Sequence, residues 1–147
     1  MGLNLNLIVA MLGFSGFLLA QGPKKLTEAP RHQEWVDFTR DNGSVLKTLI
    51  VYPENNTAAK KVILIHDNLG LNEWIKVFSH KLAGQGFLVV TPDLISNCIG
   101  SIEKTTDFEN TDKAREAIYT LDQQQVLKDL DMVYNYVEND SQSNGKI

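Results

Sequence analysis

A histidine, a carboxylate and an amide follow one another at His66, Asp67 and Asn68, directly after the apolar run Val62–Ile65. Histidine can transfer protons, a carboxylate can orient a neighbour, and a loop of this kind can direct backbone amides at a developing oxyanion. Asp and Asn are also common in turns, because their side chains bind local backbone amides. For His66 the sequence favours a structural hydrogen bond over a catalytic role.

The other candidate nucleophiles and bases have weaker support. Cys98 is the one cysteine of the chain, which excludes an intrachain disulfide and a cysteine-based zinc site. It lacks the glycine that precedes the reactive residue of a nucleophile elbow, so we interpret it as a loop thiol. His32 falls in a polar linker, and His80 falls on a helix face that is expected to be solvated. Gly70 does not begin a GxGxxG motif and a Walker lysine is missing, which argues against a nucleotide or flavin site.

Hydrophobic periodicity and turn residues predict the elements that carry these side chains. The predicted strands are Glu34–Arg40, Val45–Tyr52, Val62–Ile65 and Phe87–Leu94, and the predicted helices are Asn72–Gln85, Asp112–Thr120 and one that Asp122 caps. Asn-Gly within "DNGS" predicts a tight hairpin turn between the first two strands. The expected buried stripe of the first helix consists of Trp74, Ile75, Phe78 and Leu82.

This order of elements predicts an α/β fold, in which an antiparallel hairpin precedes parallel βαβ strands with flanking helices. Ligands of parallel sheets bind beyond the carboxyl ends of the strands. His66–Asn68 and Asp93–Cys98 follow two such strands. We therefore expect both segments to face one crevice.

Composition limits the partners and the location of the protein. Residues 1–20 carry no charge and are almost continuously apolar from Leu7 to Ala20, which is typical of a signal peptide or of an uncleaved N-terminal anchor. We expect a secreted or periplasmic protein, a polar linker over residues 21–33, and a partial domain over residues 34–147. The formal net charge is -4 and the sequence has no basic stripe, so we expect no nucleic-acid partner.

Several segments resemble, in order and spacing, the dienelactone hydrolase family of α/β-hydrolases. They are "HQEWVDF", "VYPE", "VILIHDNLGLNEWI", "LAGQGFLVVTPDLIS", "AREAIYTLDQQQVLKDLDMVYNYV" and "NGKI", which together span about Arg31 to Ile147. The resemblance implies the N-terminal half of an α/β-hydrolase sheet. It also implies hydrolysis of an ester or lactone by a Cys or Ser nucleophile with an Asp and a His, without a metal or cofactor.

The resemblance implies roles for several loop residues. Asp67 matches the acidic residue beside the family's nucleophile, and Asn68 matches the residue whose backbone N–H forms half of the oxyanion hole. Asn97 stands where members that act on dienelactone have an arginine for the substrate carboxylate, which argues against dienelactone itself as the substrate. The other loop residues expected to contact substrate are His66, Leu69 and Gly70.

In the family the nucleophile elbow follows the segment that matches "NGKI", and the triad Asp and His come later. The resemblance therefore implies an N-terminal fragment that is truncated before the elbow and has no triad-dependent turnover. The strand at 61–66 would pair with a strand beyond the fragment, so we expect its open apolar edge to self-associate. The alternative is a complete, non-catalytic exported module that binds a small ligand or a partner.

Overall fold

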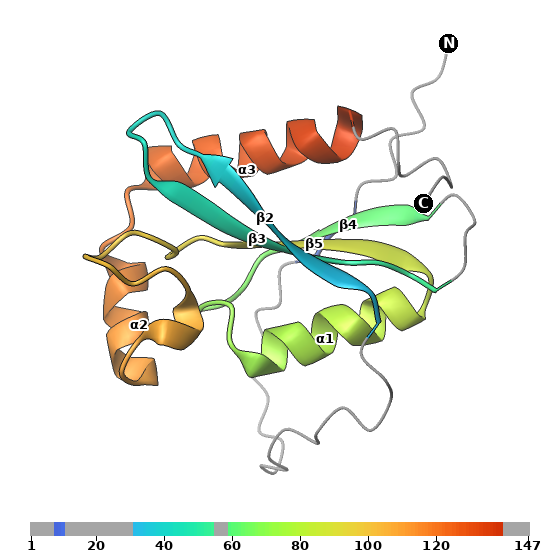
Figure 1. Ribbon diagram of the computed structural model, residues 1–147, viewed down its shortest axis with the longest axis horizontal. Coiled ribbons are helices and arrows are strands. Elements are labelled where there is room, and N and C mark those ends of the chain that lie inside the picture. Colours follow the sequence, from blue (N-terminus) through green and yellow to red (C-terminus); the bar gives the residue numbers. More distant parts are fainter. Residues whose placement is uncertain (1–7, 11–30, 55–58, 140–147) are drawn as a thin grey trace.

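A computed structural model describes residues 8–10, 31–54 and 59–139 of the chain (Figure 1). In these residues a five-stranded sheet has the order β1-β4-β5-β3-β2. The strands are β1 Ile8–Ala10, β2 Gln33–Thr39, β3 Val45–Val51, β4 Lys60–Leu64 and β5 Phe87–Asp93. The helices are α1 Glu73–Gly84, α2 Thr111–Tyr119, α3 Gln123–Asn139 and the short 3₁₀-helix η1 Thr105–Asp107. The predicted α/β class is confirmed.

The hairpin of β2 and β3 is antiparallel, as the sequence predicts. At its turn Gly43 has a φ of 82°, a conformation that glycine adopts without steric cost. The Arg40 amide donates to the Ser44 carbonyl at 2.8 Å, which closes the turn. Arg40, the residue after β2, is thereby fixed at one end of the sheet.

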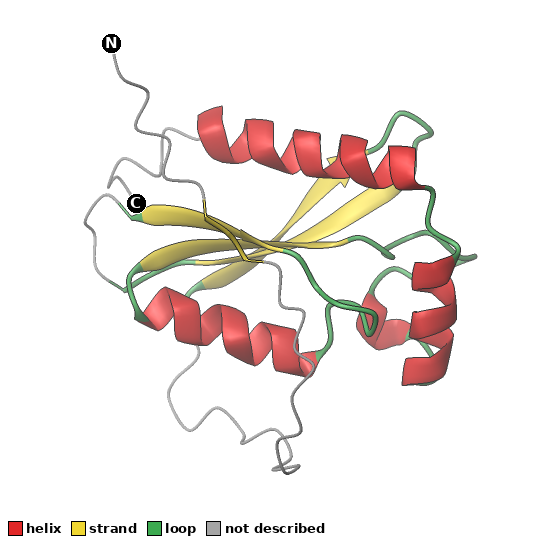
Figure 2. Ribbon diagram, turned by 180° about the vertical axis from the view of Figure 1, so that it is seen from behind, coloured by secondary structure: helices red, strands yellow, loops and turns green. Residues whose placement is uncertain are grey.

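Two core clusters cover the two faces of the sheet, one beneath α3 and the other beneath α1 (Figures 1 and 2). Side chains alternate along β3, so Leu46 and Ile50 belong to the α3 cluster while Leu49 and Val51 belong to the α1 cluster. All four are almost completely buried. This burial on both faces explains the continuous apolar runs of the sequence.

The parallel pair of β4 and β5 is joined through α1. Because the two strands are adjacent and run in the same direction, their carboxyl ends lie at the same edge of the sheet. On its other side β5 pairs antiparallel with β3. The loop between β5 and α2 contains η1, which the sequence pattern does not predict.

Helix α1 begins where the sequence predicts, because the Asn72 side chain accepts a hydrogen bond from the Ile75 amide at 3.1 Å. The predicted face of this helix is partly wrong. Trp74 is 53% exposed and stacks on Phe78, whereas His80, predicted to be solvated, is only 3% exposed. The residues that α1 buries are Ile75, Ser79, His80 and Ala83.

The physical reason is that small and hydrogen-bonded side chains let α1 lie close to the sheet. Ser79 Oγ lies 3.1 Å from Thr91 Oγ1 on β5. His80 Nε2 lies 2.8 Å from Gln33 Oε1 at the start of β2. A polar side chain can be buried when it has such a partner, and hydrophobicity alone does not reveal this.

Strand β1 belongs to the apolar N-terminal segment and runs parallel to β4, from Ile8 beside Val62 to Ala10 beside Leu64. The edge of β4 that the sequence predicts to be open is therefore paired over three residues. The rest of the predicted signal peptide, and the linker up to residue 30, lie outside the described residues. Within the described part of the chain, every helix is too short or too polar to cross a membrane.

Candidate functional site

The carboxyl ends of β4 and β5 bring two loops together, the β4–α1 loop His66–Leu71 and the β5 loop Leu94–Cys98. The amide of Leu94 donates to Nε2 of His66 at 3.1 Å. The two segments that the sequence places beyond neighbouring strand ends are therefore in direct contact. This edge of the sheet is the candidate functional site.

His66 joins the two loops and is engaged through both ring nitrogens. Nε2 accepts the Leu94 amide hydrogen, so the ring proton is on Nδ1, which donates to the carbonyl of Asp67 at 2.9 Å. The side chain is 8% exposed. These contacts agree with the structural interpretation of His66, because a ring held in this way has no free nitrogen for a substrate.

The turn after His66 is only partly hydrogen-bonded. Asp67 Oδ1 accepts from the Leu69 amide at 3.0 Å, and the Asp67 carbonyl accepts from the Gly70 amide at 3.2 Å. Asp67 and Asn68 are exposed. Among the described residues, none accepts a hydrogen bond from the Asn68 amide. This N–H is therefore available to a ligand at the rim of the site.

The buried carboxylate of Asp93 supports the β4–α1 loop through hydrogen bonds. Asp93, the last residue of β5, is fully buried and accepts two hydrogen bonds of 2.7 Å from Thr105, one from its amide and one from its hydroxyl. The Thr105 hydroxyl oxygen accepts in turn from the amide of Leu71 at 3.0 Å. Burial raises the pKa of Asp93 above its ordinary value of 3.8, and the hydrogen bonds from Thr105 oppose this rise.

The sequence does not predict the contact between Asp93 and Thr105. Twelve residues separate them, and Thr105 lies in a segment without periodicity. Only the sequence "TPD", which places a carboxylate at the end of a buried strand, marks one member of the pair in advance.

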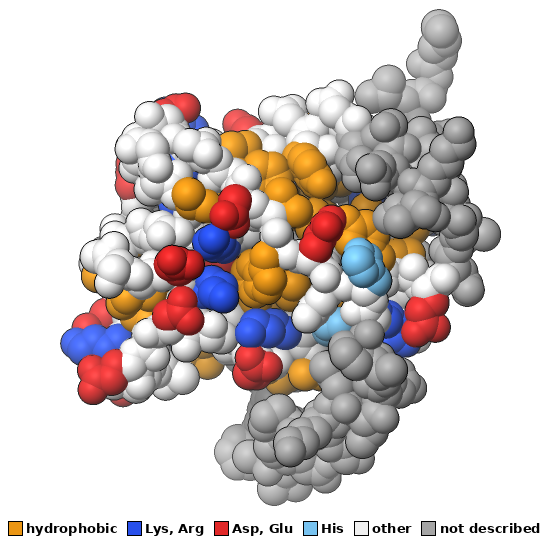
Figure 3. All heavy atoms as spheres, viewed as in Figure 1, with side chains coloured by type: hydrophobic (Ala, Val, Ile, Leu, Met, Phe, Trp, Pro, Cys, Tyr) orange, Lys and Arg blue, Asp and Glu red, His pale blue; other side chains and the backbone are white. Residues whose placement is uncertain are grey.

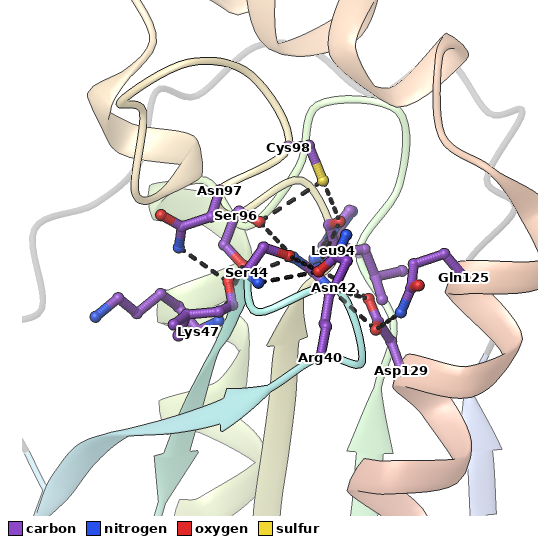
Figure 4. A network of polar contacts seen from close by, with 12 residues as sticks. Arg40, Asn42, Ser44, Lys47, Leu94, Ser96, Asn97, Cys98, Gln125 and Asp129 are labelled. Carbon is purple, nitrogen blue, oxygen red and sulfur yellow. Dashed lines mark hydrogen bonds and ion pairs between the residues drawn. The ribbon is translucent and has the colours of Figure 1, made fainter.

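The predicted site residue Asn97 lies on the β5 loop, in a left-handed conformation with a φ of 53°. Its side-chain amide donates to the Val45 carbonyl at 2.9 Å, which connects the loop to the start of β3 (Figure 4). The thiol of Cys98 donates to the Leu94 carbonyl, with Sγ and O 3.4 Å apart. Burial is the main cause of a raised pKa for Cys98, so the protonated thiol is favoured, which does not suit a nucleophile.

A buried ion pair holds the β5 loop to the neighbouring elements (Figure 4). Arg40 and Asp129 are 4% and 1% exposed, and Arg40 Nε lies 3.0 Å from each carboxylate oxygen. Arg40 Nη1 also donates to the Ser96 carbonyl at 2.8 Å, and Gln125 donates to Asp129 at 2.8 Å. The network joins the end of β2, the β5 loop and α3, and sequence reasoning did not find it.

An open groove of about 430 Å³ lies beside this network. Its lining residues are Thr39, Arg40, Asp41, Gln125, Lys128, Asp131, Met132 and Asn135. On the face shown in Figure 3, acidic and basic side chains are interspersed and form no single basic patch. Within the described ranges, no group of three or more His, Cys, Asp and Glu side chains is placed to hold a metal ion.

Comparisons with known proteins agree on one family. The model of the dienelactone hydrolase family matches residues 46–147. A Bradyrhizobium protein named "Probable 2-oxo-3-(5-oxofuran-2-ylidene)propanoate lactonase" is 32% identical over 105 residues, which are 71% of this chain and 40% of that protein. A Saccharolobus solfataricus protein assigned as a carboxymethylenebutenolidase is 37% identical over 57 residues, 39% of this chain and 21% of that protein.

The fold has a counterpart among solved structures. A Klebsiella pneumoniae protein assigned as a dienelactone hydrolase superposes with a TM-score of 0.59 at 19% identity. The alignment covers 74% of this chain and 44% of that one. This likeness confirms the predicted fold, a partial α/β-hydrolase sheet. The present chain spans 40% of the length of the first curated relative and 21% of the second.

Proposed function

This chain belongs to the dienelactone hydrolase family, and on that basis we propose that it supplies the oxyanion-binding side of an ester or lactone hydrolase. The observation that carries the proposal is the exposed Asn68 amide, which has no partner among the described residues, whereas the amides of Leu69 and Gly70 directly after it are hydrogen-bonded within the turn. Such an amide, fixed in advance and exposed at a strand end, can stabilise the oxyanion that forms when a carbonyl is attacked.

The substrate class follows from the relatives and from Asn97. The two curated relatives are named as a lactonase and a carboxymethylenebutenolidase. In this chain Asn97 is uncharged and its amide is bound to the Val45 carbonyl, so it offers no cation to a substrate carboxylate. We therefore propose an ester or lactone that does not depend on a carboxylate contact at this position.

The remaining roles are assigned from the same contacts. Asp67 holds the turn through the Leu69 amide, and its exposed carboxylate would orient a neighbouring catalytic group. We propose that the nucleophile and its Asp and His partners lie outside the described residues, since the Cys98 thiol favours its protonated form. On this proposal the chain alone has no triad-dependent turnover.

We also propose that residues 1–20 export the protein or anchor it to a membrane. The support is compositional: the segment has no charge and is apolar over a length typical of the hydrophobic region of a signal peptide. Cell fractionation of the tagged protein, with and without these residues, tests the proposal.

Hydrolysis of p-nitrophenyl acetate tests the proposed activity. We expect the purified chain to hydrolyse the ester no faster than buffer. A chimaera in which residues 31–147 replace the matching part of the Klebsiella protein should hydrolyse it. In that chimaera Asn68→Pro, which removes the amide hydrogen, should lower kcat by about 10²–10³, whereas Asn68→Ala keeps the hydrogen and the activity.

Two results would contradict the proposal. One is equal activity of the Pro and Ala variants of the chimaera. The other is turnover by the unmodified 147-residue chain that disappears in Asp67→Ala, which would show that the chain carries a working nucleophile of its own.

A further inference from the structure

We propose that Asp93 and Thr105 are positioning residues, which fix the β4–α1 loop and thereby direct the Asn68 amide at the reacting carbonyl. The inference rests on the proposed role of Asn68. It adds two residues that touch neither the substrate nor the reacting atoms. Its basis is the buried chain of hydrogen bonds from Asp93 through Thr105 to Leu71.

The proton positions in this chain are determined by its donors. The Leu71 amide can only donate, so the Thr105 hydroxyl oxygen accepts from it, and its single hydrogen is free to be donated to Asp93 Oδ1. Asp93 Oδ2 accepts the Thr105 amide hydrogen. In the ionised form of Asp93 both carboxylate oxygens therefore accept.

The loop is fitted closely to this arrangement. Gly70, two residues after Asn68, has a φ of 70°, and a Cβ on it would lie 2.7 Å from Thr105 Cγ2. The Leu71 amide is bound to Thr105, and the start of the turn is bound to the β5 loop through His66. The segment that carries Asn68 is thus held at both ends by residues at the carboxyl end of β5 and in η1.

The ionisation state of Asp93 should therefore control the conformation of the β4–α1 loop. A proton on Oδ1 would reverse the hydrogen bond with the Thr105 hydroxyl, and a proton on Oδ2 would oppose the Thr105 amide hydrogen, so either one changes the contacts that hold Thr105. Charged or titratable groups near Asp93 in the described part of the chain include His66 from the β4–α1 loop, Cys98 from the β5 loop, and Lys47 as the register neighbour on β3. Arg40 also lies nearby and donates to the Leu94 carbonyl at 3.4 Å. The ammonium of Lys47 is paired with Asp37, 2.8 Å away, so it is already neutralised.

Amide hydrogen exchange on the 147-residue chain tests this without requiring activity. Thr105→Val removes the hydroxyl at nearly constant volume and should raise the exchange rate of the Leu71 amide by about tenfold or more, with shifted resonances at Asn68 and Gly70. Thr105→Ser keeps the hydroxyl, so the exchange rate of the Leu71 amide and the resonances of Asn68 and Gly70 should stay as in the parent protein. Thr106→Val is the matched control, because Thr106 is exposed in the same short helix.

A pH titration of the unmodified protein gives a second readout that needs no variant. The Asp93 carboxyl carbon and the amides of Asn68 and Leu71 should titrate with a common midpoint above 3.8. Separate midpoints, or equal exchange in the Thr105→Val and Thr105→Ser variants, would overturn the inference. If the loop responds as expected and the Asn68→Pro chimaera stays active, the positioning stands and the proposed function fails.

Discussion

Arg40 Nη2 lies 2.9 Å from Asp129 Oδ2, in a buried ion pair whose partners are 89 residues apart in the sequence. The guanidinium reaches three elements, because it also binds backbone carbonyls of the β5 loop and of β3. Isolated charges are costly to bury, and this pair is kept by its geometry and its additional hydrogen bonds.

Loss of one partner of this pair should be severe. Asp129→Ala leaves the Arg40 charge buried without its carboxylate, so we expect the free energy of unfolding to fall by about 3–5 kcal/mol. Urea denaturation measures the change. Asp131→Ala on the exposed side of α3 is the control and should stay within about 0.5 kcal/mol of the parent protein. If the free energy of unfolding fell equally in the two variants, Asp129 would contribute no more to stability than the exposed Asp131.

A methyl group at Gly70 should cost more than one at Gly43. Both glycines have a positive φ, which costs an alanine about 1–2 kcal/mol. At Gly70 the added Cβ would also overlap Thr105, whereas at Gly43 nothing lies within 4 Å of it. Thermal melting of the two variants should therefore rank Gly70→Ala as clearly less stable. Similar melting temperatures would show that the β4–α1 loop moves aside at little cost.

His80 should make the protein less stable in mild acid. Burial, and then the charge of Arg31, lower the pKa of His80 below 6.5 in the folded state. As the pH falls through 6.5, the unfolded chain binds a proton at this residue before the folded protein does. The free energy of unfolding should therefore fall from pH 7 downwards until the folded pKa is reached.

His80→Gln should remove this part of the pH dependence and flatten the curve of unfolding free energy against pH. The histidine C–H resonances of the folded protein provide the direct check. A His80 ring that titrates at 6.5 or above would contradict the prediction.

Removal of residues 1–20 should promote self-association through β4. In the full chain Ile8–Ala10 pair with Val62–Leu64, whose side chains are at most 5% exposed. Without β1 this strand has a free edge between two apolar faces, an arrangement prone to intermolecular strand pairing. Light scattering should show a larger mass for the shortened protein than for the full chain. A shortened protein that stays a monomer with a sharp thermal transition would contradict this prediction.

Much of the fold could be predicted because local signals and tertiary packing agree. The Asn-Gly turn, the Asn72 cap and the apolar runs at β3, β4 and β5 each determine an element that the structure confirms. The α1 face was harder to predict because hydrophobicity ranks Trp74 above His80. The structure reverses this order, since the buried His80 has a hydrogen-bond partner in Gln33.

The site was only half predictable for a similar reason. A loop at a strand end makes Asp67 and Asn68 candidates, because the geometry of parallel sheets places such loops at ligand sites. The residues that support the loop come from distant segments, and their pairing depends on which side chains meet after folding. Neither the Asp93–Thr105 contact nor the Arg40–Asp129 pair has a local sequence signal.

The central position of β5 sets an order of events during synthesis. The hairpin of β2 and β3 leaves the ribosome before β4 and β5, but β3 and β4 meet only through β5, and both core clusters include β5 residues. A nascent chain that ends before Phe87 therefore exposes two apolar strands with no common neighbour. The sheet can therefore be completed only after β5 has been synthesised.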